Sequence, residues 1–202
     1  MSPMSRPPLV LASSSRYRRE LLERLRIPFD VERPDVDESA HPGESPQATA
    51  LRLSREKAAS IAARRADAIV IGADQVAESE GRPLGKPGTH ENAVMQLRAL
   101  SGKGARFHSG ICVIAPRMNE SLRFQCEVVT TTVRFRELSN AEIDTYLTLE
   151  APYDCAGSAK AEGLGIALLD RIDSDDPTAL IGLPLIRLVS MLRAIDYPIL
   201  ST

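Results

Sequence analysis

The sequence lacks the charge excess and the long apolar segments that mark several classes of protein. Its 202 residues carry 25 Lys and Arg against 27 Asp and Glu, which gives a net charge of −2. Proteins that bind nucleic-acid polymers usually carry a basic footprint, so we expect no such partner, although a local basic patch could bind a small anion. No apolar run approaches the roughly 18 residues of a membrane span. We therefore expect a cytoplasmic protein that does not enter a membrane.

Cysteine is scarce, and several motifs are absent. Cys112, Cys126 and Cys155 are odd in number and form no CxxC pair, so the sequence predicts neither a disulfide framework nor a zinc site and favours a reduced cytosol. The start of the chain has no apolar core of a signal peptide, and we expect residues 1–8 to be a disordered lead-in. The phosphate-loop pattern GxxxxGKS/T does not occur.

What is present is a regular succession of apolar patterns. The length and the 43% hydrophobic content favour one domain over residues 9–202. Strands and helices alternate early in the chain and strands pair later, which predicts a mixed sheet within an α/β fold. The expected strands cover 9–12, 27–33, 68–73, 107–115, 122–135 and 165–171, and the expected helices cover 15–25, 45–64, 89–100 and 139–149 and resume at 183.

The first strand-to-helix junction, SSSRYR, has the composition of an anion site. Ser13 and Ser15 supply hydroxyl donors, and a helix start supplies free backbone N–H groups and the positive end of a dipole. Arg18 adds a forked cation suited to phosphate. Taken alone, the stretch fits another interpretation better, because serines commonly cap helices and arginines commonly lie in solvent.

Two acidic positions could supply the chemistry. Asp74 is expected just past the end of the buried strand 68–73, where sites of α/β sheets gather. A carboxylate there can bind a divalent metal or act as a general base, or it can simply cap the next turn. Glu38 belongs to the acidic loop 35–38, which offers carboxylates to a metal but has no diagnostic spacing.

Two lysines could serve the same site. Lys57 lies near the apolar stripe of a predicted helix, so it either extends outward to solvent or points into a site. Lys86 stands between a glycine and a proline that fix the backbone, or it is an ordinary loop lysine. An anion cradle, two lysines and these carboxylates together suit metal-assisted attack on a polyphosphate.

Ordered segments throughout the chain resemble the Maf-like nucleotide pyrophosphatases. They are LASSSRYRRELL, DVDES, REKA, IGADQ, LGKP, LSGK, LSNAEID, CAGS, AEGLG and IGLPL. The resemblance implies hydrolysis of nucleoside triphosphates to the monophosphate and pyrophosphate, with a divalent metal cation such as Mg, Mn or Co. It also implies an elongated, twisted mixed sheet flanked by helices, with two lobes and a central cleft.

The resemblance assigns roles residue by residue. The family pattern S-x-S-x-x-R falls on Ser13, Ser15 and Arg18, which would bind phosphate, and Arg16 stands where the family often has proline. The helix lysine and the lysine of the GKP segment would hold phosphates, the loop acid would help to bind the metal, and the catalytic aspartate would activate water. These roles fall on Lys57, Lys86, Glu38 and Asp74.

Three positions distinguish the branches of the family. The branch that acts on dTTP and UTP has Arg, Thr and Gln where this chain has Tyr17, Gln75 and Glu162. The present set resembles the YceF subfamily, the 7-methyl-GTP pyrophosphatases, which usually have Trp at the first position. Methylation at N7 makes guanine cationic, and an aromatic face attracts a flat cation by roughly 0.5–2 kcal/mol. Guanine also presents two N–H donors that a carboxylate such as Glu162 can accept.

The expected activity is therefore the conversion of 7-methyl-GTP to 7-methyl-GMP and pyrophosphate, which would remove a modified nucleotide. One alternative keeps the chemistry and changes the substrate to dTTP or UTP. Another is a non-catalytic nucleotide-binding regulator of cell division. Members of the family often form dimers, so a homodimer is an expectation by analogy.

Overall fold

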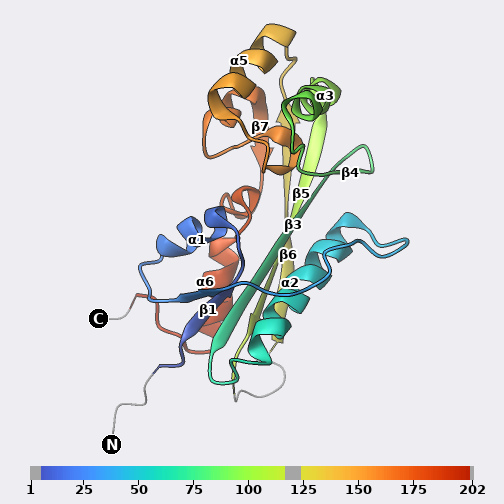
Figure 1. Cartoon of the computed structure of the whole chain (residues 1–202). Helices are drawn as coiled ribbons and strands as arrows, with labels where there is room; N and C mark the ends of the chain where they lie inside the picture. The colour runs from blue at the N-terminus through green and yellow to red at the C-terminus, as the bar shows by residue number, and fades with distance from the viewer. Residues whose placement is uncertain (1–5, 117–123, 201–202) are drawn as a thin grey trace, which may run out of the picture.

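The computed structural model describes residues 6–116 and 124–200, and these residues form a mixed seven-stranded sheet with helices on both faces (Figure 1). The strand order is β2-β1-β3-β5-β6-β7, with β4 paired to β3. β1 runs parallel to β2 and β3, whereas the β3–β5, β5–β6 and β6–β7 pairs are antiparallel. The predicted α/β class and mixed sheet are thus confirmed. The strands are β1 Leu9–Ala12, β2 Asp30–Glu32, β3 Ile69–Ser79, β4 Arg82–Leu84, β5 Gly104–Ile114, β6 Phe124–Phe135 and β7 Leu169–Asp173.

The capped helices of the sequence are confirmed. Ser15, Ser45, Thr89 and Ser139 each accept a backbone N–H in the first turn of the helix that they precede, and Ser139 forms the predicted capping box with Glu142. The helices are α1 Arg16–Glu23, α2 Pro46–Ala62, α3 His90–Leu100, α5 Asn140–Glu150 and α6 Leu185–Ala194. Short 3-10 helices cover Ala156–Ser158, Leu164–Leu168 and Ala179–Ile181.

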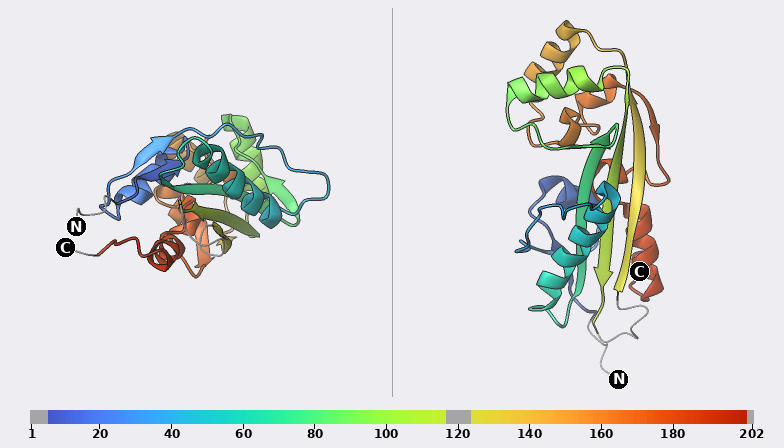
Figure 2. Two further views of the ribbon diagram at one scale, coloured as in Figure 1. Left: turned by 90° about the horizontal axis from the view of Figure 1, so that it is seen from below. Right: turned by 90° about the vertical axis from the view of Figure 1, so that its right-hand side faces the viewer.

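The molecule is elongated because β3, β5 and β6 run through most of its length (Figures 1 and 2). At one end, α1 and α6 cover one face of the sheet and α2 covers the other, which creates two apolar cores on opposite faces. At the other end, α3 and α5 pack with the far part of β5 and β6 around a third core that contains Leu97, Phe135 and Leu147. The two-lobed, elongated architecture that the resemblance implies is confirmed.

Helix α2 lies unusually close to the sheet because two glycines face it. A Cβ added to Gly72 of β3 would lie 2.1 Å from the Ser54 carbonyl oxygen, and one added to Gly110 of β5 would lie 2.2 Å from the Ala50 carbonyl oxygen. Both distances are far below van der Waals contact. With α2 in this position, glycine is therefore the only residue that fits at either site. The helix that carries Lys57 is therefore fixed closely against the strand that carries Asp74.

Several element boundaries were predicted wrongly. The apolar pattern of the predicted helix 45–64 also places Leu51 on the inward face, but Leu51 is 37% exposed and Leu53 is buried instead. The strand predicted over 165–171 begins at Leu169, because the preceding residues form a 3-10 helix. Asp74 lies inside β3 rather than past its end, since pairing with β5 continues to Glu78. The sequence also predicts a turn at 116–119 between the paired strands 107–115 and 122–135, and all of it but residue 116 lies outside the described residues. Most of the lead-in 1–8 lies outside them too, although the Pro8 carbonyl accepts a hydrogen bond from Ile69 N–H at 2.8 Å.

The prediction about the cysteines was also wrong. Cys112 and Cys126 are joined by a disulfide, and they lie directly opposite each other in the β5–β6 pairing. An odd total did not exclude this bond, because the third cysteine, Cys155, lies in a different segment and is free. In the part of the chain that the structure describes, no helix is both long enough and apolar enough to cross a membrane.

Candidate active site

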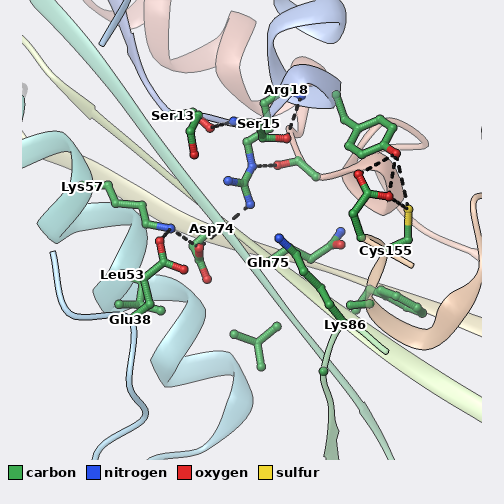
Figure 3. A pocket seen from close by; sticks show the side chains of 18 of the residues that line it. Ser13, Ser15, Arg18, Glu38, Leu53, Lys57, Asp74, Gln75, Lys86 and Cys155 are labelled. Atoms are coloured by element: carbon green, nitrogen blue, oxygen red, sulfur yellow. Dashed lines mark hydrogen bonds and ion pairs between the residues drawn. The ribbon is translucent and has the colours of Figure 1, made fainter. Parts of the chain in front are cut away.

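A cleft of about 1220 Å³ lies between the two lobes (Figure 3). Its lining comes from the β1–α1 junction, the loop between β2 and α2, helix α2, the middle of β3, the loop after β4 and residues 154–162 and 180–182. Every residue predicted for the site lines this cleft, namely Ser13, Ser15, Tyr17, Arg18, Glu38, Lys57, Asp74, Gln75, Lys86 and Glu162. The cleft therefore brings together side chains that lie far apart in the sequence, from Ser13 to Glu162.

Lys57 joins the two carboxylates that were predicted to serve chemistry. Its Nζ donates to Asp74 Oδ1 at 2.6 Å and lies 2.8 Å from Glu38 Oε1. The Lys57 side chain is 5% exposed and the Asp74 side chain 9% exposed, so this pair is shielded from water. Of the two predicted orientations of Lys57, the structure therefore has the one in which the side chain points into the cleft and not to solvent. Burial is the largest single influence and raises the pKa of Glu38, but the hydrogen bond and charge of Lys57, together with the charges of Arg18 and Lys86, lower this pKa overall.

Arg18 is the second buried cation of the cleft. Its Nε donates to the Gly182 carbonyl oxygen at 3.0 Å, and its terminal nitrogen lies 4.0 Å from Asp74 Oδ1. Burial lowers the pKa of Arg18, while the charges of Asp74 and Glu38 act in the opposite direction. A guanidinium stays protonated through such a change, so Arg18 presents a desolvated, correctly oriented positive charge beside the aspartate.

The serines of the β1–α1 junction are held by backbone hydrogen bonds. Ser13 Oγ accepts from Ser15 N–H at 3.1 Å, and Ser15 Oγ accepts from Arg18 N–H at 3.4 Å. Ser15 therefore caps α1, as expected from the alternative interpretation in which the serines have a structural role. Capping uses the oxygen and leaves each hydroxyl proton to donate to an anion in the cleft. Their phosphate-binding role stays a prediction.

Lys86 enters the cleft from a loop with a fixed backbone. Gln96 Nε2 donates to the Gly85 carbonyl oxygen at 2.9 Å, and Asn92 Nδ2 donates to the Pro87 carbonyl oxygen at 3.0 Å. The Lys86 side chain is exposed, in contrast to Lys57. It can therefore move to meet an anion while its backbone stays in place.

The other end of the cleft is acidic and contains the only aromatic residue predicted for the site. Tyr17 O–H lies 3.1 and 3.2 Å from the carboxylate oxygens of Asp154, to which it donates. The Arg16 guanidinium lies 4.7 Å from the centre of the Tyr17 ring and donates to its hydroxyl oxygen at 2.6 Å. Burial raises the pKa of the Tyr17 hydroxyl, so it stays protonated as a donor. Glu162 is exposed at the same end.

Gln75 has a structural function that the sequence did not indicate. Its Nε2 donates to Ser109 Oγ and to the carbonyl oxygens of Ala179 and Leu180, at 2.9, 2.9 and 3.0 Å. It therefore ties the middle of β3 to the segment that also supplies the Gly182 carbonyl to Arg18. If Gln75 influences the choice of substrate, as the sequence predicts, it can do so by positioning the segment that contains Ala179 and Leu180.

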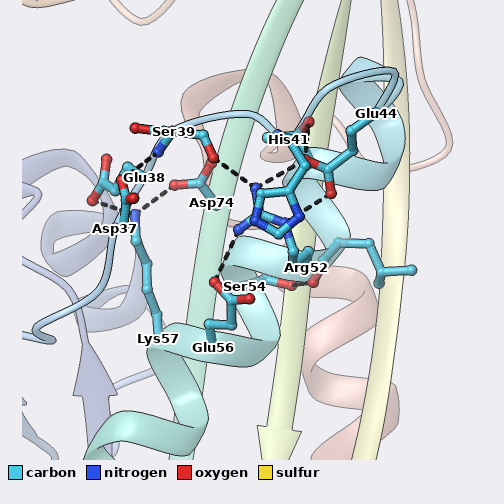
Figure 4. A network of polar contacts seen from close by, with 12 residues as sticks. Asp37, Glu38, Ser39, His41, Glu44, Arg52, Ser54, Glu56, Lys57 and Asp74 are labelled. Atoms are coloured by element: carbon cyan, nitrogen blue, oxygen red, sulfur yellow. Dashed lines mark hydrogen bonds and ion pairs between the residues drawn. The ribbon is translucent and has the colours of Figure 1, made fainter.

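Sequence reasoning missed Arg52, which clamps the loop that carries Glu38 (Figure 4). Arg52 forms a bidentate pair with Glu44, with both nitrogen–oxygen distances 2.8 Å, and donates to the Ser39 carbonyl oxygen at 2.9 Å. Its hydrogen bonds hold the pKa of Glu44 at about 2. Ser39 directly follows Glu38 in the chain. By holding the Ser39 carbonyl, Arg52 restricts the backbone that carries the Glu38 carboxylate. The sequence does not predict this pair, because Glu44 precedes helix α2 and the regular spacing of residues on one helix face does not apply to it.

Sequence reasoning also missed Asp176, which orders the segment behind Arg18 and Gln75. Asp176 is 2% exposed and accepts from Thr178 N–H and Oγ1 and from Ile186 N–H, at 3.1, 2.6 and 2.7 Å. A buried carboxylate that accepts several N–H groups fixes the loop and the start of α6 together. Its position within the DSDDPT sequence resembles an ordinary surface turn, so nothing local distinguished it.

The chemistry of the site suits a divalent metal that is shared with a substrate. Within residues 6–116 and 124–200, no group of three or more His, Cys, Asp or Glu side chains is placed to hold a metal ion. Mg²⁺ commonly uses one or two carboxylates together with substrate phosphates, so it does not need such a group. Glu38 and Asp74 are brought to the same ammonium nitrogen and therefore lie within reach of one cation.

Comparison with known proteins identifies the family of the chain. The description "Maf-like protein" matches residues 8–195. A protein of Burkholderia thailandensis named 7-methyl-GTP pyrophosphatase is 61% identical over 96% of this chain and 91% of its own length. One of Cupriavidus metallidurans with the same name is 58% identical over 98% of each chain. Among solved structures, the Staphylococcus aureus Ham1 protein is 19% identical, with a TM-score of 0.43 over 66% of this chain and 72% of its own. The chain therefore belongs to the Maf-like protein family.

Proposed function

We propose that the protein hydrolyses 7-methyl-GTP to 7-methyl-GMP and pyrophosphate, with residues 9–202 acting as one catalytic domain. The observation that carries the proposal is the polarity of the cleft. Arg18, Lys57 and Lys86 supply cations at one end, and Tyr17 and Glu162 supply an aromatic ring and a carboxylate at the other. A nucleotide with a triphosphate at one end and a cationic base at the other matches both ends. The names of the relatives at 58–61% identity support the same substrate.

The buried cations would bind and orient the triphosphate. Arg18 offers a fork of donors, and Lys57 lies between Asp74 and Glu38 with its ammonium group shielded from water. In such a low-dielectric setting, fixed charges stabilise the charge that develops on the phosphates more strongly than mobile ions in water would. Lys86 would close over the phosphates from its exposed loop.

Asp74 would hold and deprotonate the attacking water. Its Oδ1 is bound by Lys57, which orients the carboxylate toward the cleft. Attack of this water on a phosphorus atom of the α–β linkage forms a new P–O bond and breaks the bond to the bridging oxygen, which gives the monophosphate and pyrophosphate. A bound divalent metal, held by Glu38 and Asp74 with the phosphates, would supply Lewis-acid polarisation of the phosphate oxygens.

The base end supports a methylated guanine over a pyrimidine. The Tyr17 ring already attracts one flat cation, the Arg16 guanidinium at 4.7 Å from the ring centre. Glu162 can accept the two N–H groups of guanine, whereas uracil and thymine present one N–H between carbonyl groups that a carboxylate repels. The ring and the carboxylate therefore favour the same base for independent reasons.

A panel of triphosphates tests the proposal. Purified protein is incubated with Mg²⁺, Mn²⁺ or Co²⁺ and with 7-methyl-GTP, GTP, dTTP or UTP, and pyrophosphate release gives kcat/KM. We expect the highest value for 7-methyl-GTP. A preference for dTTP or UTP would keep the chemistry and refute the substrate. Nucleotide binding without release of pyrophosphate from any of them would support a regulator instead.

A further inference from the structure

The two ends of the cleft differ in their side chains, and one carboxylate at the end that contains Tyr17 has no role so far. Asp154 lies in the cleft lining together with Tyr17 and Glu162. Cys155 Sγ lies 3.6 Å from Asp154 Oδ1, and burial, together with the charges of Asp154 and Glu162, raises the pKa of the Cys155 thiol. Glu162 can accept guanine N–H groups, but Asp154 is held at the Tyr17 hydroxyl instead.

Asp154 is oriented by the ring that is proposed to stack with the base. The Tyr17 hydroxyl donates to both of its oxygens, at 3.1 and 3.2 Å, so the carboxylate lies at the edge of the ring. A cation above the ring is attracted by the ring face and by this carboxylate at the same time. A neutral group above the ring gains little from the carboxylate.

Arg16 provides direct evidence for such a cation position. Its guanidinium is flat, delocalised and positive, and it lies 4.7 Å from the ring centre and 3.6 Å from Asp154 Oδ2. A guanine methylated at N7 is likewise flat, delocalised and positive. The side chains of Arg16 and Asp154 are 66% and 53% exposed, so the contact is weak and can be exchanged.

We propose that Asp154 is a specificity-determining residue that senses the positive charge of a methylated base, and that Arg16 is the internal cation that the base replaces at the Tyr17 ring. The inference rests on the proposed function and deepens it. Asp154 would distinguish methylated from unmethylated guanine, which share their N–H donors and therefore look alike to Glu162. Arg16 would lower the affinity for both nucleotides and compete most directly with the charged base.

Binding of the monophosphates 7-methyl-GMP and GMP tests the inference without turnover, because neither has an anhydride bond. Calorimetry at slightly acidic pH, where the methylated base keeps its charge, gives a ratio of Kd values for the wild-type protein, Asp154→Asn and Arg16→Gln. We expect the preference for 7-methyl-GMP to fall about fivefold in Asp154→Asn and to rise in Arg16→Gln. Added salt should weaken the preference of the wild-type protein more than that of Asp154→Asn.

The matched control is Asp144→Asn, which removes an exposed carboxylate from α5 outside the cleft lining. It should leave the ratio unchanged. An unchanged ratio in Asp154→Asn, or a lower ratio in both site variants, would overturn the inference. A wild-type protein without preference for the methylated base would overturn it as well. Pyrophosphate release from 7-methyl-GTP, measured separately, decides whether the proposed function survives in that case.

Discussion

The phosphate end and the base end of the cleft differ in how firmly their charges are held. At the phosphate end, Lys57 and Asp74 have side chains 5% and 9% exposed and are joined by a hydrogen bond of 2.6 Å. At the base end, Arg16 and Asp154 are 66% and 53% exposed and lie 3.6 Å apart. Buried pairs resist rearrangement and are weakly screened, whereas exposed pairs are weak and exchangeable. The chemical step can therefore be fixed while base selection stays adjustable.

The largest expected effect is at the phosphate end, from Asp74→Asn. The amide cannot accept a proton from water, so kcat should fall by about 10²–10⁴-fold, the range of general-base catalysis. Nucleotide binding, measured by calorimetry with a non-hydrolysable triphosphate, should persist because Arg18 and Lys86 stay in place. Normal kcat in a variant with an unchanged melting temperature would remove Asp74 from the mechanism.

Lys57→Met should strongly destabilise the protein. The substitution leaves the buried Asp74 carboxylate without its closest cation, which typically costs about 3 kcal/mol of unfolding free energy. Urea unfolding measures the loss. The double variant Lys57→Met, Asp74→Asn should recover part of it, because no unpaired charge is then buried. Additive losses in the double variant would show that the two side chains do not interact.

Arg52→Gln should reduce kcat/KM by about tenfold through the position of Glu38, an order-of-magnitude expectation for displaced active-site geometry. The variant loses the bidentate bond to Glu44 and the support of the Ser39 carbonyl. It should also require more metal for half-maximal activity, which a purely structural loss would not cause. Arg55→Gln on the same helix is a suitable control, because Arg55 lies outside the cleft lining. An unchanged metal requirement would refute a positioning role for Arg52.

A smaller effect is expected at the base end, from Glu162→Gln. The carboxylate becomes an amide that can donate as well as accept, so the preference for 7-methyl-GTP over UTP should fall by about tenfold. The ratio of kcat/KM values measures this change, and kcat itself should stay similar because Glu162 is at the end opposite Asp74. An equal ratio in both proteins would mean that the base is read elsewhere.

A last prediction concerns a chemical probe of the base end and not its activity, namely the alkylation of the half-buried Cys155. Burial raises the pKa of its thiol to about 11, while the Tyr17 hydroxyl acts in the opposite direction. The thiolate is the reactive form, so alkylation by iodoacetamide should be about 100-fold slower than for an exposed thiol near pH 8 and should accelerate as pH rises. In urea without reductant, one thiol should react, because Cys112 and Cys126 are joined. Rapid alkylation of the folded protein would contradict this burial.

The sequence predicted the parts of the molecule that depend on local pattern. The β1 strand and the capped start of α1 follow from a short apolar run and from Ser15, and the structure has both. Prediction from the sequence failed for contacts between residues that lie far apart in the chain. The Arg52 clamp, the position of Asp154 beside Tyr17 and the bond between Cys112 and Cys126 depend on loop path and strand register, which no local pattern encodes.

Polar residues also misled the assignment of strand β3. The sequence predicts that the strand ends at residue 73, but β3 continues to Ser79 because the neighbouring strand satisfies its polar side chains. Gln75 donates to Ser109 of β5, and Glu78 pairs with His108 of the same strand at 3.2 Å. A strand that carries a site on part of its length can thus look like a loop in the sequence.

The close approach of α2 to the sheet has a consequence for how the enzyme can vary. Gly72 and Gly110 contribute no functional group, yet a methyl group at either position would collide with the α2 backbone. Displacement of α2 would carry Lys57 away from Asp74 and Arg52 away from the Glu38 loop in one movement. Substitution of either glycine would therefore disturb the residues proposed for proton transfer, phosphate binding and metal binding together, although neither glycine lines the cleft.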